Sequence, residues 1–519
     1  MSQDLSTRRD ATPASEPARL SRAQMNVIFV TILLGMLLSA LDQTIVSTAL
    51  PTIVGDLGGA GHMSWVVTAY MLAETISTVL AGKFGDQFGR KRVFQISVLI
   101  FIVGSFFCGL SQNMTTLIAF RAVQGIGGGG LAVTATALIG EIIPLRERGK
   151  YQGALGAVFG VTTVLGPLLG GLFTDHLSWR WAFYVNVPIA IVVILLAART
   201  IPGARTAGVK PTIDYLGVLF VGLGASGLIL ATSWGGTEYP WGSATIIGLF
   251  AGSLICLGIF VLVEVRAKEP IMPMRLFRGR VFTMASILSF IVGFAMMGSI
   301  TFLPTFLQFV GGASATSSGV RMLPMVIGLL LTAIASGSIV GRTGKYRMFP
   351  IAGAAITAFG LYLMSLLDQN TPLWRESVYF FVLGAGIGLI MQILTLIVQS
   401  TAEYRDLGTA TSGVTFFRTL GGSFGAAVLG SIYSNQIAGR LPAAIAESPG
   451  LSPEAATNPA ALHALPAAVQ APVVNAYAES LHNVFLWAVP VALAALVVAL
   501  FPRTACCDRS STRSWRPGS

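Results

Sequence analysis

The feature that most constrains this chain is a series of long apolar stretches that recur along nearly all of its 519 residues. A helix that crosses a bilayer needs about 20 mostly apolar residues. Repeated stretches of this kind predict an all-α integral membrane protein and differ from the short alternating strands of a membrane β-barrel. We assign 14 transmembrane helices to residues 26–50, 64–82, 93–111, 115–140, 151–173, 181–199, 213–232, 244–263, 282–309, 319–341, 349–367, 374–400, 407–435 and 480–501.

The composition excludes the main soluble alternatives. Only 11% of the residues are charged, whereas soluble domains carry about 25%. A net charge of +11 would suggest nucleic acid as a partner of a soluble protein, but in so apolar a chain it indicates basic loops on one side of a membrane. The four cysteines have neither disulfide nor metal-ligand spacing. We therefore expect no nucleic-acid partner and no metal.

The distribution of basic residues predicts the orientation of the chain. If the chain starts in the cytosol, 27 of its 33 Lys and Arg residues fall in cytosolic segments, and only Arg180, Arg375 and Arg440 fall in outer loops. Basic residues concentrate in the cytosolic loops of membrane proteins. The asymmetry therefore predicts a multi-pass protein of the cell (inner or plasma) membrane with both termini cytoplasmic. If one span had been missed, the basic residues would no longer fall mainly on one side.

An internal repeat predicts how the helices are grouped. The segment that starts at Gly82 aligns with the one that starts at Gly337, and Gly89 then matches Gly344. Each segment follows the second helix of a six-helix unit, and the two units have the same orientation. Parallel repeats of this kind occur in transporters whose substrate site lies between the halves. A chance match is the alternative, because glycine and basic residues are common in short cytosolic loops.

The repeat leaves two helices between the six-helix units and one long outer loop, rich in Ala and Pro, without a predicted role. The predicted parts are a cytosolic N-terminal tail (1–24), an N-terminal six-helix bundle (25–201), inserted helices 7 and 8 (202–265), a cytosolic linker (266–280), a C-terminal six-helix bundle (281–502, with the outer loop 437–479) and a cytosolic C-terminal tail (503–519).

Ionisable residues inside the spans are the first functional candidates. Asp42, Glu74, Arg121, Arg321 and Arg418 lie in apolar stretches, where each charge costs roughly 2.5–3.5 kcal/mol. Such residues pair with one another or mark a path for ions or substrate. Arg321 is expected near an outer end of its span, from which its side chain can reach the interface.

Asp42 and Glu74 lie at similar distances from the turn between their helices, so we expect them at similar depth, with Arg121 in a neighbouring span. Burial favours the protonated form of a carboxyl group, and a nearby guanidinium favours the ionised form. We hypothesise that Asp42 and Glu74 carry protons and that Arg121 tunes them. The alternative is a buried ion pair that only fixes helix packing.

The segment around Gly82, Gly85 and Gly89 has a mechanical interpretation. Its glycines permit a tight turn between two spans. Asp86 can meet a helix N-terminus or a cation across the interface between the halves and so favour the outward-open state. Arg90 and the basic residues after it would also anchor the cytosolic face.

The fifth span carries small residues four apart, at Gly156 and Gly160 and again at Gly166 and Gly170. Such pairs let another helix approach closely, and Pro167 bends the helix. Either a rigid interface that prevents uncoupled leak or generic close packing explains the pattern.

Four segments in order, residues 41–51, 82–92, 121–125 and 156–171, carry a family resemblance, to which residues 179–188 add. Together they resemble the fourteen-span drug:proton antiporters of the major facilitator superfamily, of the multidrug efflux type, over about 25–435 and 480–501. The resemblance implies a gating role for Asp86 and Arg90 and a leak-preventing role for the fifth span. Gly341 stands where the repeat would place a second acid, which argues against a charge relay in that half.

Three residues of the second half are candidates to line a substrate cavity: Arg418, Phe416 and Gln392. Aromatic side chains suit lipophilic cations, although a single one more often serves helix packing. The glycines at 125–130 fit a dinucleotide fingerprint, but they lie in a membrane span without the strand that this motif needs.

The sequence therefore predicts a proton-coupled exporter (antiporter) of lipophilic, cationic compounds that works by alternating access. We expect a small lipophilic substrate, protons and the lipid bilayer as its partners, a monomer, and no cofactor, because a proton gradient would drive it. An exporter of one endogenous metabolite, lipid or self-produced antibiotic is the alternative within this class. A non-transporting membrane sensor is the alternative from another class; no nucleophile or metal cluster indicates an enzyme.

Overall fold

The computed structural model describes residues 21–58, 63–202, 214–236, 238–448 and 451–500. Within these ranges the chain is helical almost throughout and contains no strand, only one isolated bridge between Gly235 and Tyr239. This is the expected result, because in a bilayer a helix satisfies its backbone hydrogen bonds internally. The C-terminal tail and most of the N-terminal tail lie outside the described residues, as do 203–213 of the predicted hairpin segment.

The helices have the following bounds: α1 (Arg22–Leu57), α2 (Met63–Phe88), α3 (Arg90–Leu110), α4 (Met114–Ile142), α5 (Leu145–His176), α6 (Trp181–Tyr184), α7 (Asn186–Thr200), α8 (Tyr215–Trp234), α9 (Ala244–Arg266), α10 (Arg275–Arg278), α11 (Arg280–Ile300), α12 (Leu303–Thr305), α13 (Ala315–Arg321), α14 (Leu323–Thr343), α15 (Met348–Ser365), α16 (Leu373–Thr401), α17 (Leu407–Ala446), α18 (Pro453–Ala456), α19 (Pro459–His463) and α20 (Ala467–Leu500).

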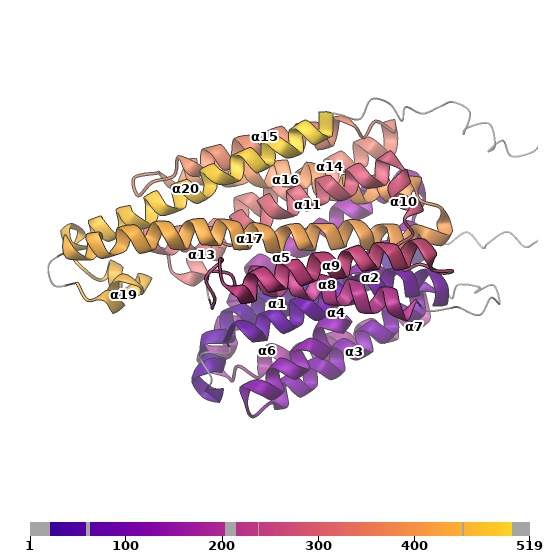
Figure 1. Cartoon of the computed structure of the whole chain (residues 1–519), viewed down its shortest axis with the longest axis horizontal. Helices are drawn as coiled ribbons and strands as arrows, with labels where there is room; N and C mark the ends of the chain where they lie inside the picture. The colour runs from indigo at the N-terminus through magenta and orange to yellow at the C-terminus, as the bar shows by residue number, and fades with distance from the viewer. Residues whose placement is uncertain (1–20, 59–62, 203–213, 237, 449–450, 501–519) are drawn as a thin grey trace, which may run out of the picture.

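The long helices run side by side in two groups (Figure 1). Helices α1 to α7 form one bundle, and α11 to α20 form the other, which we call the N-half and the C-half. Helices α8 and α9 pack against each other, and α8 also packs against α2 and α17. The pair therefore lies along one seam between the two halves.

Twelve helices in the described part of the chain are long and apolar enough to cross a membrane. They coincide with twelve of the fourteen predicted spans. The other two predicted spans, 151–173 and 407–435, lie within α5 and α17. Gly, Ser and Thr residues, which lower mean hydropathy, are frequent in 407–435, whereas α5 contains residues outside the described set, and its described stretch Leu165–Thr174 is apolar but short. The finding is an all-helical membrane protein with about twelve candidate spans.

Two predicted spans are not single helices. The stretch 282–309 is broken, because α11 ends at Ile300 and α12 and a π-helix (Phe306–Val310) follow. Pro304 lies in the first turn of α12, a position where its missing N–H is tolerated. The stretch 181–199 is divided between α6 and α7.

The predicted loop that contains Gly82 is wrong in its local structure. Helix α2 continues to Phe88, so Gly82, Gly85 and Asp86 lie in its last turns. Gly89 alone makes the turn to α3, with a φ of 92° that favours glycine. Its partner in the repeat, Gly344, ends α14 with a φ of 69°. The two aligned glycines thus have the same structural role, which supports the repeat.

The long predicted loop 437–479 is largely helical. Helices α17 and α20 both extend into it, and α18 and α19 lie between them. The ring of Tyr477 stacks on that of Phe309, with 4.1 Å between centroids, and Leu462 of α19 is fully buried. These contacts tie the extension to the end of the C-half at which the π-helix lies.

Candidate functional site

An ion pair lies sealed inside the N-half. Asp42 of α1 is fully buried, and its Oδ2 lies 2.5 Å from Nη1 of Arg121 of α4, which is 2% exposed. The guanidinium lies over the ring of Tyr70, 4.2 Å from its centroid, and donates from Nε to the Val66 carbonyl. These contacts offset part of the cost of burying two charges. The structure thus joins two residues that the sequence predicts as neighbours.

Three uncharged side chains complete what we call the Asp42 centre: Asp42, Arg121, Gln124, Asn186 and Ser105. Oδ1 of Asp42 accepts hydrogen bonds from the amides of Gln124 and Asn186, both at 2.8 Å. Both amides also donate to the Ser105 hydroxyl at 3.0 Å. The sequence alone does not single out these three residues, although Gln124 and Asn186 lie in segments that carry the family resemblance.

Glu74 of α2 has different surroundings from Asp42. Its side chain is only half-buried, and its Oε2 accepts a hydrogen bond of 2.7 Å from Gln43, the neighbour of Asp42 on α1. The two carboxyl groups therefore lie at similar depth, as their similar distances along the chain from the turn between α1 and α2 predict. No described basic side chain lies within 4.0 Å of Glu74, which leaves its carboxylate free to pair with another cation.

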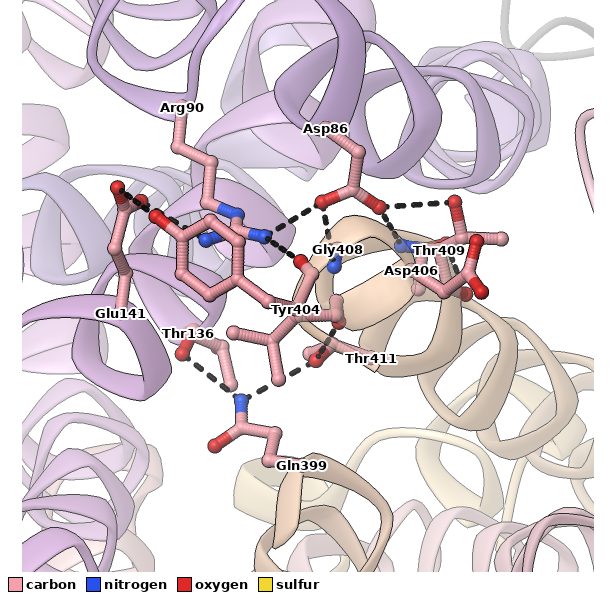
Figure 2. A network of polar contacts seen from close by, with 12 residues as sticks. Asp86, Arg90, Thr136, Glu141, Gln399, Tyr404, Asp406, Gly408, Thr409 and Thr411 are labelled. Atoms are coloured by element: carbon pink, nitrogen blue, oxygen red, sulfur yellow. Dashed lines mark hydrogen bonds and ion pairs between the residues drawn. The ribbon is translucent and has the colours of Figure 1, made fainter. Parts of the chain in front are cut away.

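A second polar centre lies at the end of the bundle where α3 begins with Arg90, Lys91 and Arg92, which we call the basic end (Figure 2). Asp86 points at the N-terminus of α17, and its two oxygens accept the backbone N–H groups of Gly408 at 2.9 Å and Thr409 at 2.8 Å. A carboxylate is stabilised at a helix N-terminus by these donors and by the helix dipole. The N-half thus caps a C-half helix.

Arg90 extends this contact along the interface. Its guanidinium lies 2.7 Å from Asp86 and 2.9 Å from Glu141 at the end of α4, and it donates to the Tyr404 carbonyl at 3.2 Å. The Tyr404 hydroxyl donates to Glu141 at 2.8 Å. Burial, together with the neighbouring carboxylate, raises the pKa of Tyr404 to about 12, so the hydroxyl remains a donor. Sequence analysis did not single out Tyr404 or Glu141.

Gln399 of α16 makes a further connection between the halves (Figure 2). Its amide donates to the Thr136 carbonyl of α4 at 3.0 Å and to the Thr411 hydroxyl of α17 at 3.2 Å. Gln152 of α5 donates to its Oε1 at 3.0 Å. Several fully formed polar contacts therefore hold the two halves together at the basic end.

Close helix contacts explain most of the predicted glycines. A Cβ on Gly82 would overlap Ser412 of α17, and one on Gly166 would overlap Thr44 of α1. Gly170 meets Thr48 and the Ile45 carbonyl in the same way. A Cβ on Gly85 would lie 3.3 Å from the Arg90 side chain, which would have to shift slightly, and Gly156 has ordinary contacts. The surroundings of Gly160 lie outside the described residues.

Helix α5 therefore packs against both halves, with Pro167 inside it between the two glycines that meet α1. Nearer the basic end, Gly149 meets the backbone of Gly337 on α14, and Gly153 meets that of Ala333. The glycines of α4 at 125 and 127–130 likewise meet α2 and α3, which agrees with packing and not with a dinucleotide site. Small residues are how membrane helices approach closely.

Of the three candidate cavity residues of the C-half, Phe416 lies on a different side of α17 from Arg418. Arg418 and Gln392 make no hydrogen bond or ion pair with the described residues. Phe416 is buried in a cluster with Val79 of α2 and Val221 of α8. Phe416 thus packs on the side of α17 that faces α8, and its place in a cavity stays a prediction.

Within the described ranges, no group of three His, Cys, Asp or Glu side chains could hold a metal ion. The chemistry that the two polar centres permit is transfer of protons, exchange of ion pairs and reversible contact between the halves.

The family model of the Major Facilitator Superfamily matches residues 32–426. The chain belongs to this superfamily. Its members are transporters and not enzymes, and the resemblance to this superfamily inferred from the sequence motifs is confirmed. An uncharacterized MFS-type transporter of Mycobacterium tuberculosis is 54% identical over 484 residues, which are 93% of this chain and 70% of the relative.

Two relatives have names that refer to multidrug transport or resistance. The multidrug transporter protein MdtP of Bacillus subtilis is 40% identical over 411 residues, covering 79% of this chain and 76% of the relative. Multidrug resistance protein 3 of the same organism is 34% identical over 488 residues, covering 92% and 95%.

Solved structures share the fold of this chain. The human organic anion transporter MFSD10 superposes with a TM-score of 0.63 at 13% identity and covers 93% of this chain and all of the other. The proton:xylose symporter XylE superposes with a TM-score of 0.57 at 14% identity, covering 91% and 96%.

Proposed function

We propose that this protein is a proton-coupled secondary active exporter, an antiporter of lipophilic, cationic compounds that works by alternating access. The single observation that carries the proposal is the pairing of a sealed carboxylate with a half-buried one at the same depth. Asp42 is held by Arg121 inside the N-half, while Glu74 has no basic partner among the described residues. The efflux names of the relatives support the direction of transport.

Glu74 would be the residue at which a proton is exchanged for the cationic substrate. A carboxylate that faces the interior can hold either a proton or a cationic group, but poorly both, so binding one displaces the other. Asp42 would couple this exchange to conformation. Both of its oxygens are occupied by Arg121, Gln124 and Asn186, so taking up a proton requires Arg121 to move away, which loosens α1 from α4.

The basic end would be the cytosolic side, because basic residues concentrate there. The contacts of Asp86, Arg90, Tyr404 and Gln399 close that end, so the arrangement corresponds to access from the outside. Opening to the cytosol would break the bonds from Asp86 to Gly408 and Thr409. Asp86 and Arg90 are thus proposed as gate residues.

The remaining parts of the proposal concern organisation. We infer fourteen spans, with α5 and α17 added to the twelve candidates. Helices α8 and α9 would be the inserted hairpin, and both termini would be cytoplasmic in the plasma membrane. The protein would work as a monomer without a cofactor, driven by the proton gradient.

The test is transport by purified protein in liposomes with an imposed pH gradient. Asp42→Asn and Glu74→Gln should each abolish proton release that depends on a lipophilic cation, because neither side chain can then take up a proton. Glu447→Gln, a change to an exposed carboxylate beyond α17, is the matched control and should behave as wild type. Undiminished proton release by both interior variants would contradict the proposal.

A further inference from the structure

Arg418 lies deep in the C-half without a partner among the described residues. It is eleven residues into α17, or about 16 Å from the basic end of that helix. No described carboxylate lies within 4.0 Å of it, and no described group accepts a hydrogen bond from it. A guanidinium at this depth is costly, and such residues face a protein interior or a water-filled path.

The neighbours of Arg418 show which way it faces. Phe416 and Leu420 both pack in the cluster that includes α8. Residues two apart on an α-helix lie on nearly opposite sides. Arg418, two positions from each, therefore faces away from α8, on the side of α17 where Gly421 and Gly425 meet α11 within the C-half.

Glu74 faces away from α8 by the same reasoning. On α2, Leu72 packs against the α8 cluster and Ile76 lies beside Gly222 of α8. Glu74, two positions from each, points to the opposite side, where Gln43 of α1 holds it.

Glu74 and Arg418 also lie at one depth. Helices α2 and α17 cross where Gly82 meets both Gly408 and Ser412. Glu74 lies eight residues from Gly82, and Arg418 lies ten residues from Gly408 and six from Ser412. With a rise of about 1.5 Å per residue, both side chains are about 12 Å from the crossing.

Gln392 joins them from α16. Its helix runs antiparallel to α17, and Gln399 and Thr411 are hydrogen-bonded across the pair. One heptad further from the basic end, the same face of each helix carries Gln392 and Arg418. The amide of Gln392 makes no hydrogen bond to the described residues and lies beside Gly156 of α5.

We propose that Glu74 and Arg418, with Gln392, form a two-pole site for an amphoteric lipophilic compound, one that carries a cationic group and a carboxylate. The cationic group pairs with Glu74. The carboxylate pairs with the guanidinium of Arg418, whose planar fork matches it, and with the amide of Gln392. This inference rests on the proposed function, and it narrows the substrate class, because a purely cationic compound would leave the guanidinium unpaired.

The test uses the full chain in liposomes and two dyes that share one xanthylium cation. Rhodamine 110 carries a free carboxylate, and rhodamine 123 is its methyl ester. The measured quantity is the ratio of free-acid to ester transport. Arg418→Gln should lower this ratio roughly tenfold to a hundredfold, the size expected when a charge-assisted hydrogen bond is lost. Arg418→Lys should restore most of it because the charge is retained.

Two further variants keep the result interpretable. Gln392→Leu should lower the ratio in the same direction but less, since it removes a neutral donor. Arg321→Gln, a change to another arginine of the C-half, should leave the ratio unchanged. An equal loss of both dyes in the Arg418 and Gln392 variants, or an unchanged ratio, overturns the two-pole site. If the wild type does not move even rhodamine 123 in response to the pH gradient, the proposed function itself fails.

Discussion

Two helix contacts at the basic end are related by the internal repeat yet differ in chemistry. In the first, α2 meets α17 at Gly82 and Gly408; in the second, α14 meets α5 at Gly337 and Gly149. In both, the backbones approach more closely than a Cβ would allow. Only the first has a carboxylate, Asp86, placed on the N-terminus of the partner helix.

The difference concerns how each contact opens. Helix α17 lacks a capping side chain of its own and receives one from the N-half. Helix α5 begins after Pro144 without a side-chain cap, and Gly341 stands where the repeat would place an acid. Hydrogen bonds to a charge depend steeply on distance and angle, whereas glycine packing tolerates rotation but not added volume. The α2–α17 contact is therefore held by hydrogen bonds that must break on opening, and we call it the latch. The α14–α5 contact allows the helices to rotate while they stay packed, and we call it the bearing.

The largest effect is expected from adding volume to the bearing. Gly149→Val should prevent the basic end from closing, because its side chain would overlap the backbone of Gly337. Overpacking costs about 3 kcal/mol or more where backbone cannot yield, a shift of over a hundredfold toward the open state. Labelling of a cysteine introduced at Ser412, which is buried in the latch, should become correspondingly faster, and transport should cease.

A glycine in an open position provides the control for this variant. A Cβ on Gly252 of α9 would meet nothing within 4 Å, so Gly252→Val should transport normally. If Gly149→Val also transports normally, the α14–α5 contact is not needed for closure and the comparison fails.

A smaller effect is expected from weakening the latch. Asp86→Asn keeps an acceptor for one N–H but loses the charge, which should destabilise the closed contact by about 1–2 kcal/mol. Turnover in liposomes should fall about five- to thirtyfold, while the dissociation constant for the transported dye changes by less than about threefold. A selective loss of dye binding would count against a gating role.

Adding an acid to the second contact sharpens the same comparison. Gly341→Asp in the Asp86→Asn background should recover only part of the turnover. The new carboxylate would cap the N-terminus of α5, whereas the N-terminus of α17 would remain without its charged cap. Full recovery would show that the two contacts are interchangeable.

The smallest effect concerns the ion pair between Lys83 of α2 and Glu269, whose atoms lie 2.9 Å apart. The hydrogen bond from Lys83 lowers the pKa of Glu269. A lowered pKa in the closed state means that the pair contributes at neutral pH and is lost only as the pH falls below the ordinary glutamate value of about 4.5. Because Glu269 is half exposed, Lys83→Gln should change closure by less than about 1 kcal/mol. A change in labelling of Ser412→Cys above tenfold at pH 7 would contradict this.

Charged residues in apolar stretches were sufficient to predict much of the site. The partnership of Asp42 with Arg121 and the meeting of Asp86 with a helix N-terminus both follow from the cost of an unpaired charge. Asn186, Gln124 and Ser105 escaped prediction because they carry no charge, and the candidates for this centre are the ionisable residues inside the spans. Their importance lies in three-dimensional convergence on Asp42, which no spacing along the chain encodes.

Helix boundaries near glycine and proline were the least predictable part of the fold. Gly82 and Gly85 suggested a turn, but only Gly89 makes one, because glycine serves both for turns and for close contact. Phe416 was assigned to a cavity on composition, whereas its place opposite Arg418 on the helix turns it toward α8. The tertiary neighbours of a helix decide which of its faces meets substrate.

The length of α17 has a consequence beyond its contacts. Its 40 residues extend for about 60 Å, roughly twice the hydrocarbon thickness of a bilayer. Asp86 holds its first turn, while its far end lies beside the short helix α19 (Figure 1). A tilt imposed at one membrane face is therefore transmitted along α17 toward the opposite face, and a spectroscopic label near Ile437, ahead of Pro442, would register an event that takes place at Gly408.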